Sequence, residues 1–174
     1  MLRKAIEEEQ RSLTGAQQLI TEIEEALMEN LMAVGVPGVD SEDRAVINIR
    51  TWMPKIQNRN DPRQFWDFDS AGSNGRRVLF TVCYAIAIHQ VAERHGLPIP
   101  SILLLDTPTK DVARDANQEI HDAMQQRIAQ LTSTSLKKTQ LIVADSSFVQ
   151  VAPVSDYRLY ELSRQSGLIK YYHD

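Results

Sequence analysis

Two short apolar runs, joined by a stretch with helical spacing, constrain the fold of this chain most strongly. The first run is Ile102 to Asp106, directly after a segment with two prolines, and the second covers residues 139–144. Continuous apolar runs of this length are typical of strands that are buried on both faces of a parallel sheet. Parallel strands need a crossover connection, and a helix is the usual one. We therefore expect an α/β fold in which a parallel sheet is flanked by helices.

Two helices are expected next to these strands. Residues 78–94 are apolar around most of the helix circumference, and Gly96 follows at the position where helices commonly end. Residues 111–131 have one apolar side, made by Val112, Ala116, Ile120, Met124 and Ile128. The order helix, strand, helix, strand predicts right-handed crossovers. In the tail, residues 157–165 predict a short helix and residues 168–172 an edge strand.

The N-terminal residues 2–31 favour one long helix, because they are rich in Glu, Gln, Ala and Leu and contain no proline. Its apolar stripe is made by Leu13, Ala16, Ile20, Ile23 and Leu27. The stripe fits either the stub of a coiled coil or an amphipathic helix packed on its own domain, and it covers too few heptads to choose. Residues 34–40 contain glycines and a proline that end the helix. We therefore divide the chain into a helical arm, residues 1–33, and one α/β domain, residues 34–174.

Between the arm and the first apolar helix, alternating residues predict a strand. One face carries Ala45, Ile47, Ile49 and Thr51, and the more polar face carries Val46, Asn48, Arg50 and Trp52. Residues 58–63 are expected to form a polar loop. We expect Trp52 and Trp66 to be core or interface anchors rather than platforms for stacked bases.

The composition is that of a globular protein. Hydrophobic residues make up 43% and charged residues 24% of the chain, which argues against a disordered or a membrane protein. The apolar stretches are far shorter than the ~20 residues that span a bilayer, and the pattern of a secretory signal is missing. A net charge of -4 gives no overall basic footprint of the kind that a stand-alone nucleic-acid binder shows. Because Cys83 is the single cysteine, no internal disulfide can form, which agrees with a location in the reducing cytoplasm.

A loop of small residues directly before the apolar helix is the first candidate site. It consists of Gly72, Ser73, Asn74, Gly75, Arg76 and Arg77. Small residues let backbone amides approach a ligand, and the amides at a helix N-terminus favour negative charge, so the loop is a candidate phosphate site. Taken alone, the loop favours another interpretation, in which Ser73 or Asn74 simply caps the helix.

Polar residues at the ends of the two expected strands form the second and third candidate sites. Asp106 and Thr107 end the first strand, and Asp145 and Ser146 follow the second. In open α/β sheets, ligands bind at the carboxyl ends of parallel strands, where an acid can hold Mg²⁺. The alternatives are a turn after Asp106 and an Asx-type turn at Asp145.

Taken together, the order and spacing of these three sites resemble the carboxy-terminal lobe of ABC-type ATPases of the structural-maintenance-of-chromosomes (SMC) and DNA-repair class. The resemblance covers roughly residues 69–147. It makes the loop at Gly72 the family's signature loop, with Ser73 and Gly75 at its serine and second glycine. It also makes Ile102 to Asp106 the Walker B strand, residues 109–112 the loop after it, and Asp145 or Ser146 the switch position. The N-terminal helix would match the descending arm of the family's coiled coil.

This resemblance implies ATP and Mg²⁺ as cofactors and an ATP molecule sandwiched between two heads. Ser73 and Gly75, with Asn74 and Arg76 beside them, would meet the γ-phosphate that an opposing P-loop holds, while Asp106 binds Mg²⁺. The implied partners are an amino-terminal P-loop lobe or a partner subunit, a second head in a homo- or heterodimer, and DNA. We expect no membrane among the partners.

Departures from the family pattern leave two other functions open. Thr107 stands where the family has the glutamate that activates water, and threonine cannot accept that proton, so Asp111 or Asp145 would have to do so. Asn74 replaces a glycine, and no Gly-x-x-x-x-Gly-Lys-Ser/Thr motif is present. The chain is then either half of an ATPase or a catalytically degenerate scaffold that pairs with an active partner. An unrelated α/β enzyme with its site at Asp106 and Asp145 is the other alternative.

Overall fold

The computed structural model describes residues 2–108, 118–145, 158 and 160, and side chains from Leu13 onward. The described elements are, in chain order, α1 (Leu2–Val34), β1 (Asp43–Asn48), β2 (Met53–Asn58), β3 (Phe65–Asp67), α2 (Asn74–His95), β4 (Ile102–Asp106), α3 (Gln118–Ser133) and β5 (Gln140–Ala144). The helix and strand expected in the tail, and the first turns expected for α3, lie outside the described residues apart from Arg158 and Tyr160. None of the described helices is both long and apolar enough to cross a bilayer.

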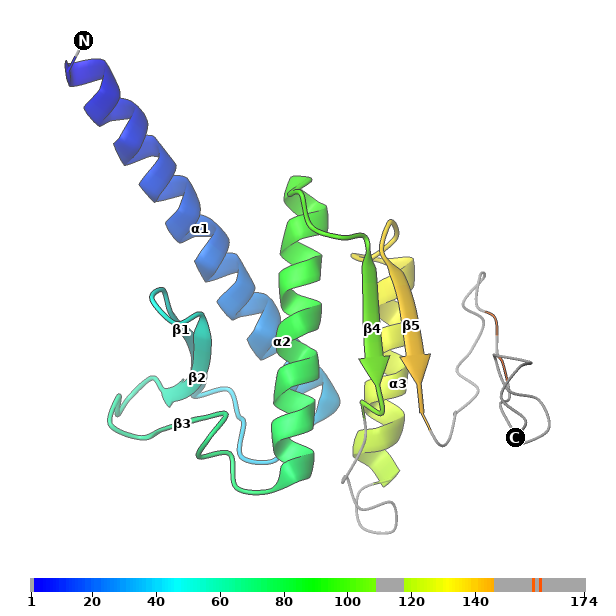
Figure 1. Ribbon diagram of the computed structural model, residues 1–174. Helices are drawn as coiled ribbons and strands as arrows, with labels where there is room; N and C mark the ends of the chain where they lie inside the picture. The colour runs from blue at the N-terminus through cyan, green and yellow to red at the C-terminus, as the bar shows by residue number, and fades with distance from the viewer. Residues whose placement is uncertain (1, 109–117, 146–157, 159, 161–174) are drawn as a thin grey trace, which may run out of the picture.

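The strands form two separate sheets (Figure 1). β4 and β5 pair in parallel, with Ile102 opposite Gln140 and Asp106 opposite Ala144. This confirms the predicted parallel pairing and the helical connection, since α3 lies between the two strands in sequence. β1, β2 and β3 form an antiparallel meander that the sequence did not predict beyond its first strand. The chain is therefore a mixed α/β protein.

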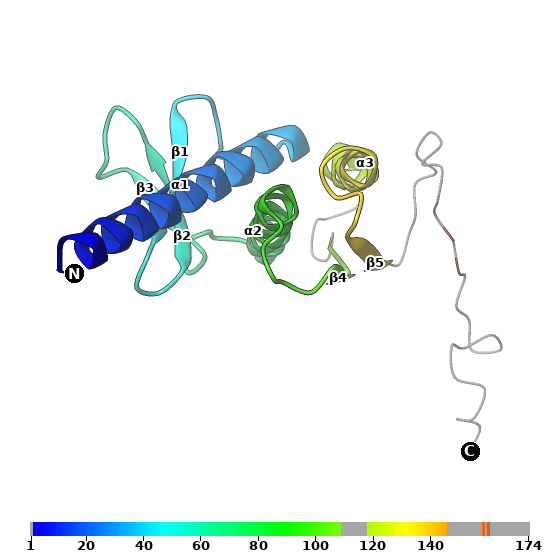
Figure 2. The same ribbon diagram turned by 90° about the horizontal axis from the view of Figure 1, so that it is seen from above.

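The prediction that β4 and β5 are buried on both faces is wrong for the described structure. Leu103 and Leu105 point toward the core, but Leu104 is 66% exposed and Ile142 is 42% exposed. Both helices near this pair, α2 and α3, lie on one side of it, as the view from above shows (Figure 2). The outer face has an apolar character without a covering layer among the described residues.

The first strand is shorter than the alternating pattern predicted. β1 ends at Asn48, because the backbone N–H of Trp52 donates to the Asn48 carbonyl at 2.7 Å and closes a turn. Trp52 has a positive φ of 56°, which takes the chain out of the extended conformation. The next strand, β2, pairs back on β1 in register, with Ala45 opposite Ile56. The residues at 59–64 form the expected polar loop.

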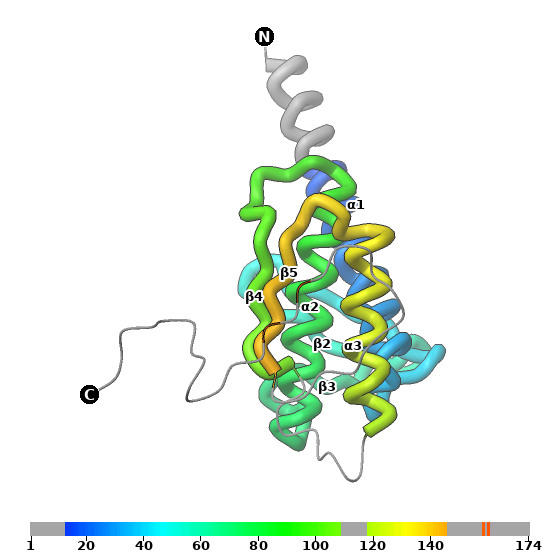
Figure 3. The backbone as a smooth tube through the Cα atoms, turned by 90° about the vertical axis from the view of Figure 1, so that its right-hand side faces the viewer, coloured from blue at the N-terminus to red at the C-terminus, as the bar shows by residue number. Residues whose placement is uncertain are grey.

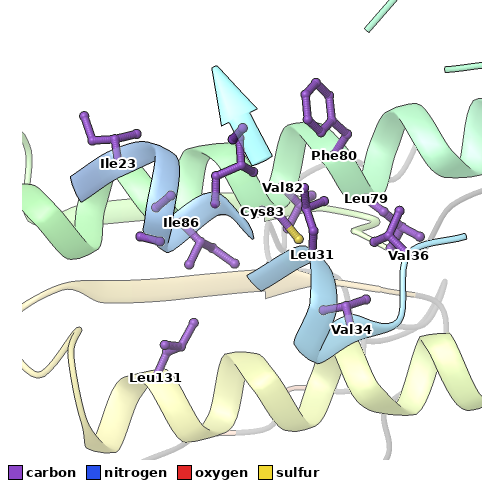
Figure 4. Packing of buried hydrophobic residues seen from close by; sticks show 14 of the residues in the cluster. Ile23, Leu31, Val34, Val36, Leu79, Phe80, Val82, Cys83, Ile86 and Leu131 are labelled. Atoms are coloured by element: carbon purple, nitrogen blue, oxygen red, sulfur yellow. The ribbon is translucent and has the colours of Figure 1, made fainter. Parts of the chain in front are cut away.

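α2 lies in the centre of the hydrophobic core (Figure 4). It begins four residues earlier than predicted and ends as predicted, with Gly96 at φ 62° accepting the left-handed conformation of the C-cap. The second half of α1 packs against it through Ile23, Leu27, Leu31 and Val34, whereas Leu13 in the same stripe is exposed. The part of α1 from Ile23 onward thus behaves as an amphipathic helix on its own domain, and residues 13–18 are left exposed.

A buried polar network joins the three helices. The Arg127 guanidinium on α3 donates from Nε to Oδ1 of Asn30 at 2.9 Å and from a terminal nitrogen to Glu29 at 2.6 Å, both on α1. Asn30 in turn donates to Oε1 of Gln90 on α2 at 2.8 Å. The side chains of Asn30, Gln90 and Arg127 are all buried. Because buried polar groups cost free energy when they lose a partner, this network fixes how the helices sit on one another.

We expect Arg127→Met to lower the free energy of unfolding by about 1–3 kcal/mol, since Oδ1 of the fully buried Asn30 loses its donor while the apolar stem is kept. Urea denaturation of the full chain measures the change. Arg63→Met is the matched control, because the Arg63 side chain is almost fully exposed, and it should shift the value by less than about 0.5 kcal/mol. Equal effects of the two substitutions would contradict the network's role.

Candidate functional site

The ends of β4 and β5 bring two of the expected acidic residues to one edge. Asp106 lies opposite Ala144 in the parallel register, so Asp145 follows at the same end of the pair. The backbone N–H of Thr107 donates to the Ala144 carbonyl at 2.7 Å and extends the ladder by one bond. The structure therefore places Asp106, Thr107 and Asp145 together, at the edge where open α/β sheets bind ligands. Ser146 and Asp111 lie outside the described residues.

Thr107 is held in a conformation that is unusual for its type. Its φ of 51° lies in the left-handed region, which costs a β-branched residue on the order of 1 kcal/mol or more. Its hydroxyl donates to Oδ1 of Asp106 at 2.8 Å. As a donor to this carboxylate, the threonine can orient Asp106, but it cannot act as the base that the family's glutamate provides.

The described residues at this edge offer a magnesium ion one carboxylate ligand, that of Asp106, so most of its ligands would have to come from elsewhere. Asp106 is an exposed carboxylate at a strand end. Among the described residues, no group of three or more His, Cys, Asp or Glu side chains is arranged to hold a metal. Mg²⁺ commonly takes one or two carboxylates and completes its shell with water and substrate phosphates, so one protein ligand is consistent with a nucleotide-dependent site.

In the loop before α2, Ser73 is the N-cap of the helix. Its side-chain oxygen accepts a hydrogen bond from the Arg76 backbone N–H at 3.3 Å. Gly72, at φ 85°, takes a left-handed conformation that a larger residue rarely adopts. Asn74 is the first helical residue, and Gly75 is buried in the first turn. In this structure Ser73 therefore caps the helix, as the alternative interpretation predicted. A ligand bound at this loop would have to contact the same hydroxyl.

Arg76 packs against the meander. Its guanidinium carbon lies 3.7 Å from the centre of the Trp66 ring on β3, and a terminal nitrogen donates to the Gly38 carbonyl at 3.3 Å. Burial lowers the pKa of Arg76, although Asp43 acts in the opposite direction. A Cβ at Gly38 would come within 2.9 Å of the guanidinium, so glycine makes room for it. The sequence offered no signal for this contact, which joins residues far apart in the chain.

The signature-like loop and the strand ends lie at the same end of the molecule. α2 and β4 run in opposite directions, so the helix begins where the strand finishes (Figures 1 and 3). At 1.5 Å per residue the helix is about 33 Å long, whereas the five residues of β4 cover about 16 Å. Figure 1 shows the start of α2 extending beyond the end of β4, so Ser73, the N-cap of α2, lies at this end of the molecule but not level with the strand end.

Cys83 is a packing residue, as the sequence predicted. It lies on α2 and is completely buried, and burial raises the pKa of its thiol to about 12. The reactive form of a cysteine is the thiolate, so a thiol of this kind is inert.

We expect no reaction of Cys83 with Ellman's reagent in the folded chain at pH 8, where the thiol stays protonated and covered. The same chain in concentrated urea should release one equivalent of the coloured thiolate, because an unfolded cysteine has a pKa near 8.5. Rapid labelling of the folded protein would show that the packing around α2 opens.

Comparisons with known proteins leave the family open. No protein-family model matches the chain, and no curated protein matches its sequence. One similar solved structure comes from work on ATP-driven dimerization and DNA-stimulated activation of SMC ATPases. It is 16% identical, with a TM-score of 0.46, over 77% of this chain and 73% of that chain. A likeness at this level carries no functional conclusion, which must come from the chain's own geometry.

Proposed function

We propose that the chain is the carboxy-terminal lobe of an SMC-like ATPase head, which contributes the Ser73 loop and the Asp106 strand end to ATP held between two heads. The observation that carries this proposal is the β4–β5 pair. It presents Asp106 and Asp145 at one edge, and none of the described residues covers its apolar outer face.

This face, which no described residue covers, favours a lobe that is completed by another lobe. Parallel sheets normally have both faces covered, and a sheet of only two strands is marginal by itself. Ile102, Leu104 and Ile142 point to this face and are exposed. Full burial of a side chain of this size contributes roughly 1.5–3 kcal/mol, and because these three side chains are 40–66% exposed, a covering layer gains a part of that amount from each. A P-loop lobe would supply both this layer and the phosphate-binding motif that the sequence lacks.

Each residue of the site would then have one task. Asp106, oriented by the Thr107 hydroxyl, would be the protein ligand of Mg²⁺. The ion would neutralise charge on the transferred phosphoryl group. Ser73 and the amides at the start of α2 would face the γ-phosphate held by the opposing head, where the partial positive charge of a helix N-terminus favours an anion. Asp145, at the same edge as Asp106, would accept the proton of the attacking water.

A second candidate, the non-hydrolysing scaffold, is favoured by Thr107. At the position where a base is needed, the chain has a hydroxyl that donates to Asp106. Such a lobe would dock on an active partner and transmit the closing of the heads without hydrolysis at its own site.

The test is ATP hydrolysis by the full chain, alone and mixed with P-loop polypeptides encoded by neighbouring genes. We expect activity only in a mixture, and we expect Asp106→Asn to lower its kcat at least 100-fold, since the metal loses its carboxylate. Ser73→Asp should also lower kcat while leaving stability unchanged, because aspartate caps a helix as well as serine does but repels a phosphate. Glu25→Gln, an exposed carboxylate on α1, is the control and should change neither property.

Two results would contradict the ATPase proposal. Hydrolysis by the chain alone would favour an unrelated enzyme with its site at Asp106 and Asp145. A partner that binds the chain but shows no effect of ATP, Asp106→Asn or Ser73→Asp would favour the scaffold.

A further inference from the structure

The turn between β1 and β2 exposes three large apolar side chains within five residues. Ile49 is 66% exposed, Trp52 54% and Met53 46%. Single exposed apolar residues are ordinary on a protein surface, but several at one tip indicate a contact surface. Tryptophan and methionine are also among the residues enriched in protein interfaces, and tryptophan often supplies most of the binding energy.

The backbone of this turn is fixed rather than loose. Trp52 keeps its positive φ of 56° although it is a bulky residue. Its N–H donates to the Asn48 carbonyl at 2.7 Å, and its carbonyl accepts from the Tyr84 hydroxyl of α2 at 2.9 Å. A strained conformation persists only where the surroundings hold it. The molecule therefore holds the Trp52 backbone in place while leaving about half of the residue's surface exposed.

The turn lies on the same side of the molecule as the β4–β5 pair. In the view from above, the turn between β1 and β2 and the two parallel strands are on one side of α1, with α2 between them (Figure 2). Tyr84 connects the turn to α2, and the partly exposed Leu97 follows α2 on the way to β4. The apolar turn and the apolar outer face of the β4–β5 pair therefore lie on the same side of the molecule, with α2 between them.

The charges around the turn favour a protein over a nucleic acid as its occupant. Lys55 lies over the Phe65 ring, 5.0 Å from its centre, and Arg59 donates to the Asp43 carbonyl. The acids Glu42, Asp43 and Asp61 lie near the end of the β1–β2 hairpin that is farthest from the turn. Arg50 is the single charged residue among residues 49–53. Nucleic-acid surfaces gather cations around exposed rings, whereas the cations of this meander, Arg44, Arg50, Lys55, Arg59 and Arg63, are interspersed with acids.

We propose that residues 49–53 and the outer face of β4–β5 are two parts of one docking surface, on which the P-loop lobe lies across α2 with Trp52 as an anchor. The identity of the bound lobe rests on the proposed function. The inference that the two patches form one surface rests on their position on the same side of the molecule, their apolar character and their fixed geometry. The lobe would reach the hairpin as well as the strands, and its orientation relative to α2 would be set at two points.

The test is site-specific photo-crosslinking of the full-length protein in the cells that naturally express it. The photoreactive residue p-benzoylphenylalanine replaces Trp52, Ile142 or, as the control, the strongly exposed Arg63. We expect positions 52 and 142 to cross-link to the same polypeptide, one that carries a Gly-x-x-x-x-Gly-Lys-Ser/Thr motif, whether separate or joined to this chain. Position 63 should not cross-link to it.

The outcomes separate this inference from the proposed function. A P-loop polypeptide caught at position 142 but not at 52 overturns the inference and leaves the proposed function standing. No P-loop polypeptide at position 142 overturns the proposed function. Cross-links from position 52 to nucleic acid, to a second copy of this chain, or to its own residues 146–174 each overturn the inference.

A second measurement uses the polypeptide so identified. Trp52→Ala should weaken its binding to this chain about 30-fold or more, the effect of removing an interface anchor. The Tyr84 bond goes to the backbone of residue 52, so the turn keeps this contact in the variant. Trp52→Phe should retain most of the affinity. Unchanged binding by Trp52→Ala would contradict the role of Trp52.

Discussion

The all-round apolar surface of α2 is the constraint on which the described structure depends. A helix with apolar residues around most of its circumference must be covered from several directions. Residues of α1, β1, β2, β4 and α3 join it in one buried cluster. The Arg127 network then fixes α1 and α3 relative to α2, because each buried polar group needs its partner. Covering α2 also sets the direction of β4 and so brings the start of the helix and the end of the strand to one end of the molecule.

The sequence predicted the elements whose pattern is local. β4, β5 and the end of α2 at Gly96 followed from apolar runs and a glycine at a helix end, and the parallel register then placed Asp106 beside Asp145. The meander was only partly predictable. β2 includes Pro54 and Gln57, so it lacks a clean alternation, and its pairing with β1 supplies what its own propensity does not.

The sequence could not predict the contacts between residues far apart in the chain, nor the exposure of the outer face of the β4–β5 pair. Nothing near Arg76 in the chain indicates that its guanidinium would stack on Trp66 and bond to the Gly38 carbonyl. The runs at β4 and β5 correctly indicated strands that are apolar on both sides. They could not tell that Leu104 and Ile142 would be exposed among the described residues, because apolar side chains look the same in the sequence whichever segment covers them. The exposed apolar face of β4–β5, as far as the described residues show it, is therefore the feature on which the proposed partner depends.

Hydrogen–deuterium exchange tests this claim most directly, since it reports how firmly each backbone amide is held. In the chain alone, the amides of residues 102–106 and 140–144 should exchange much faster than those in the middle of α2. Addition of the P-loop polypeptide should slow them toward the α2 rates. If the two strands are already as protected as α2 in the chain alone, or if their exchange stays the same in the complex, the sheet is complete as it stands and the account is wrong.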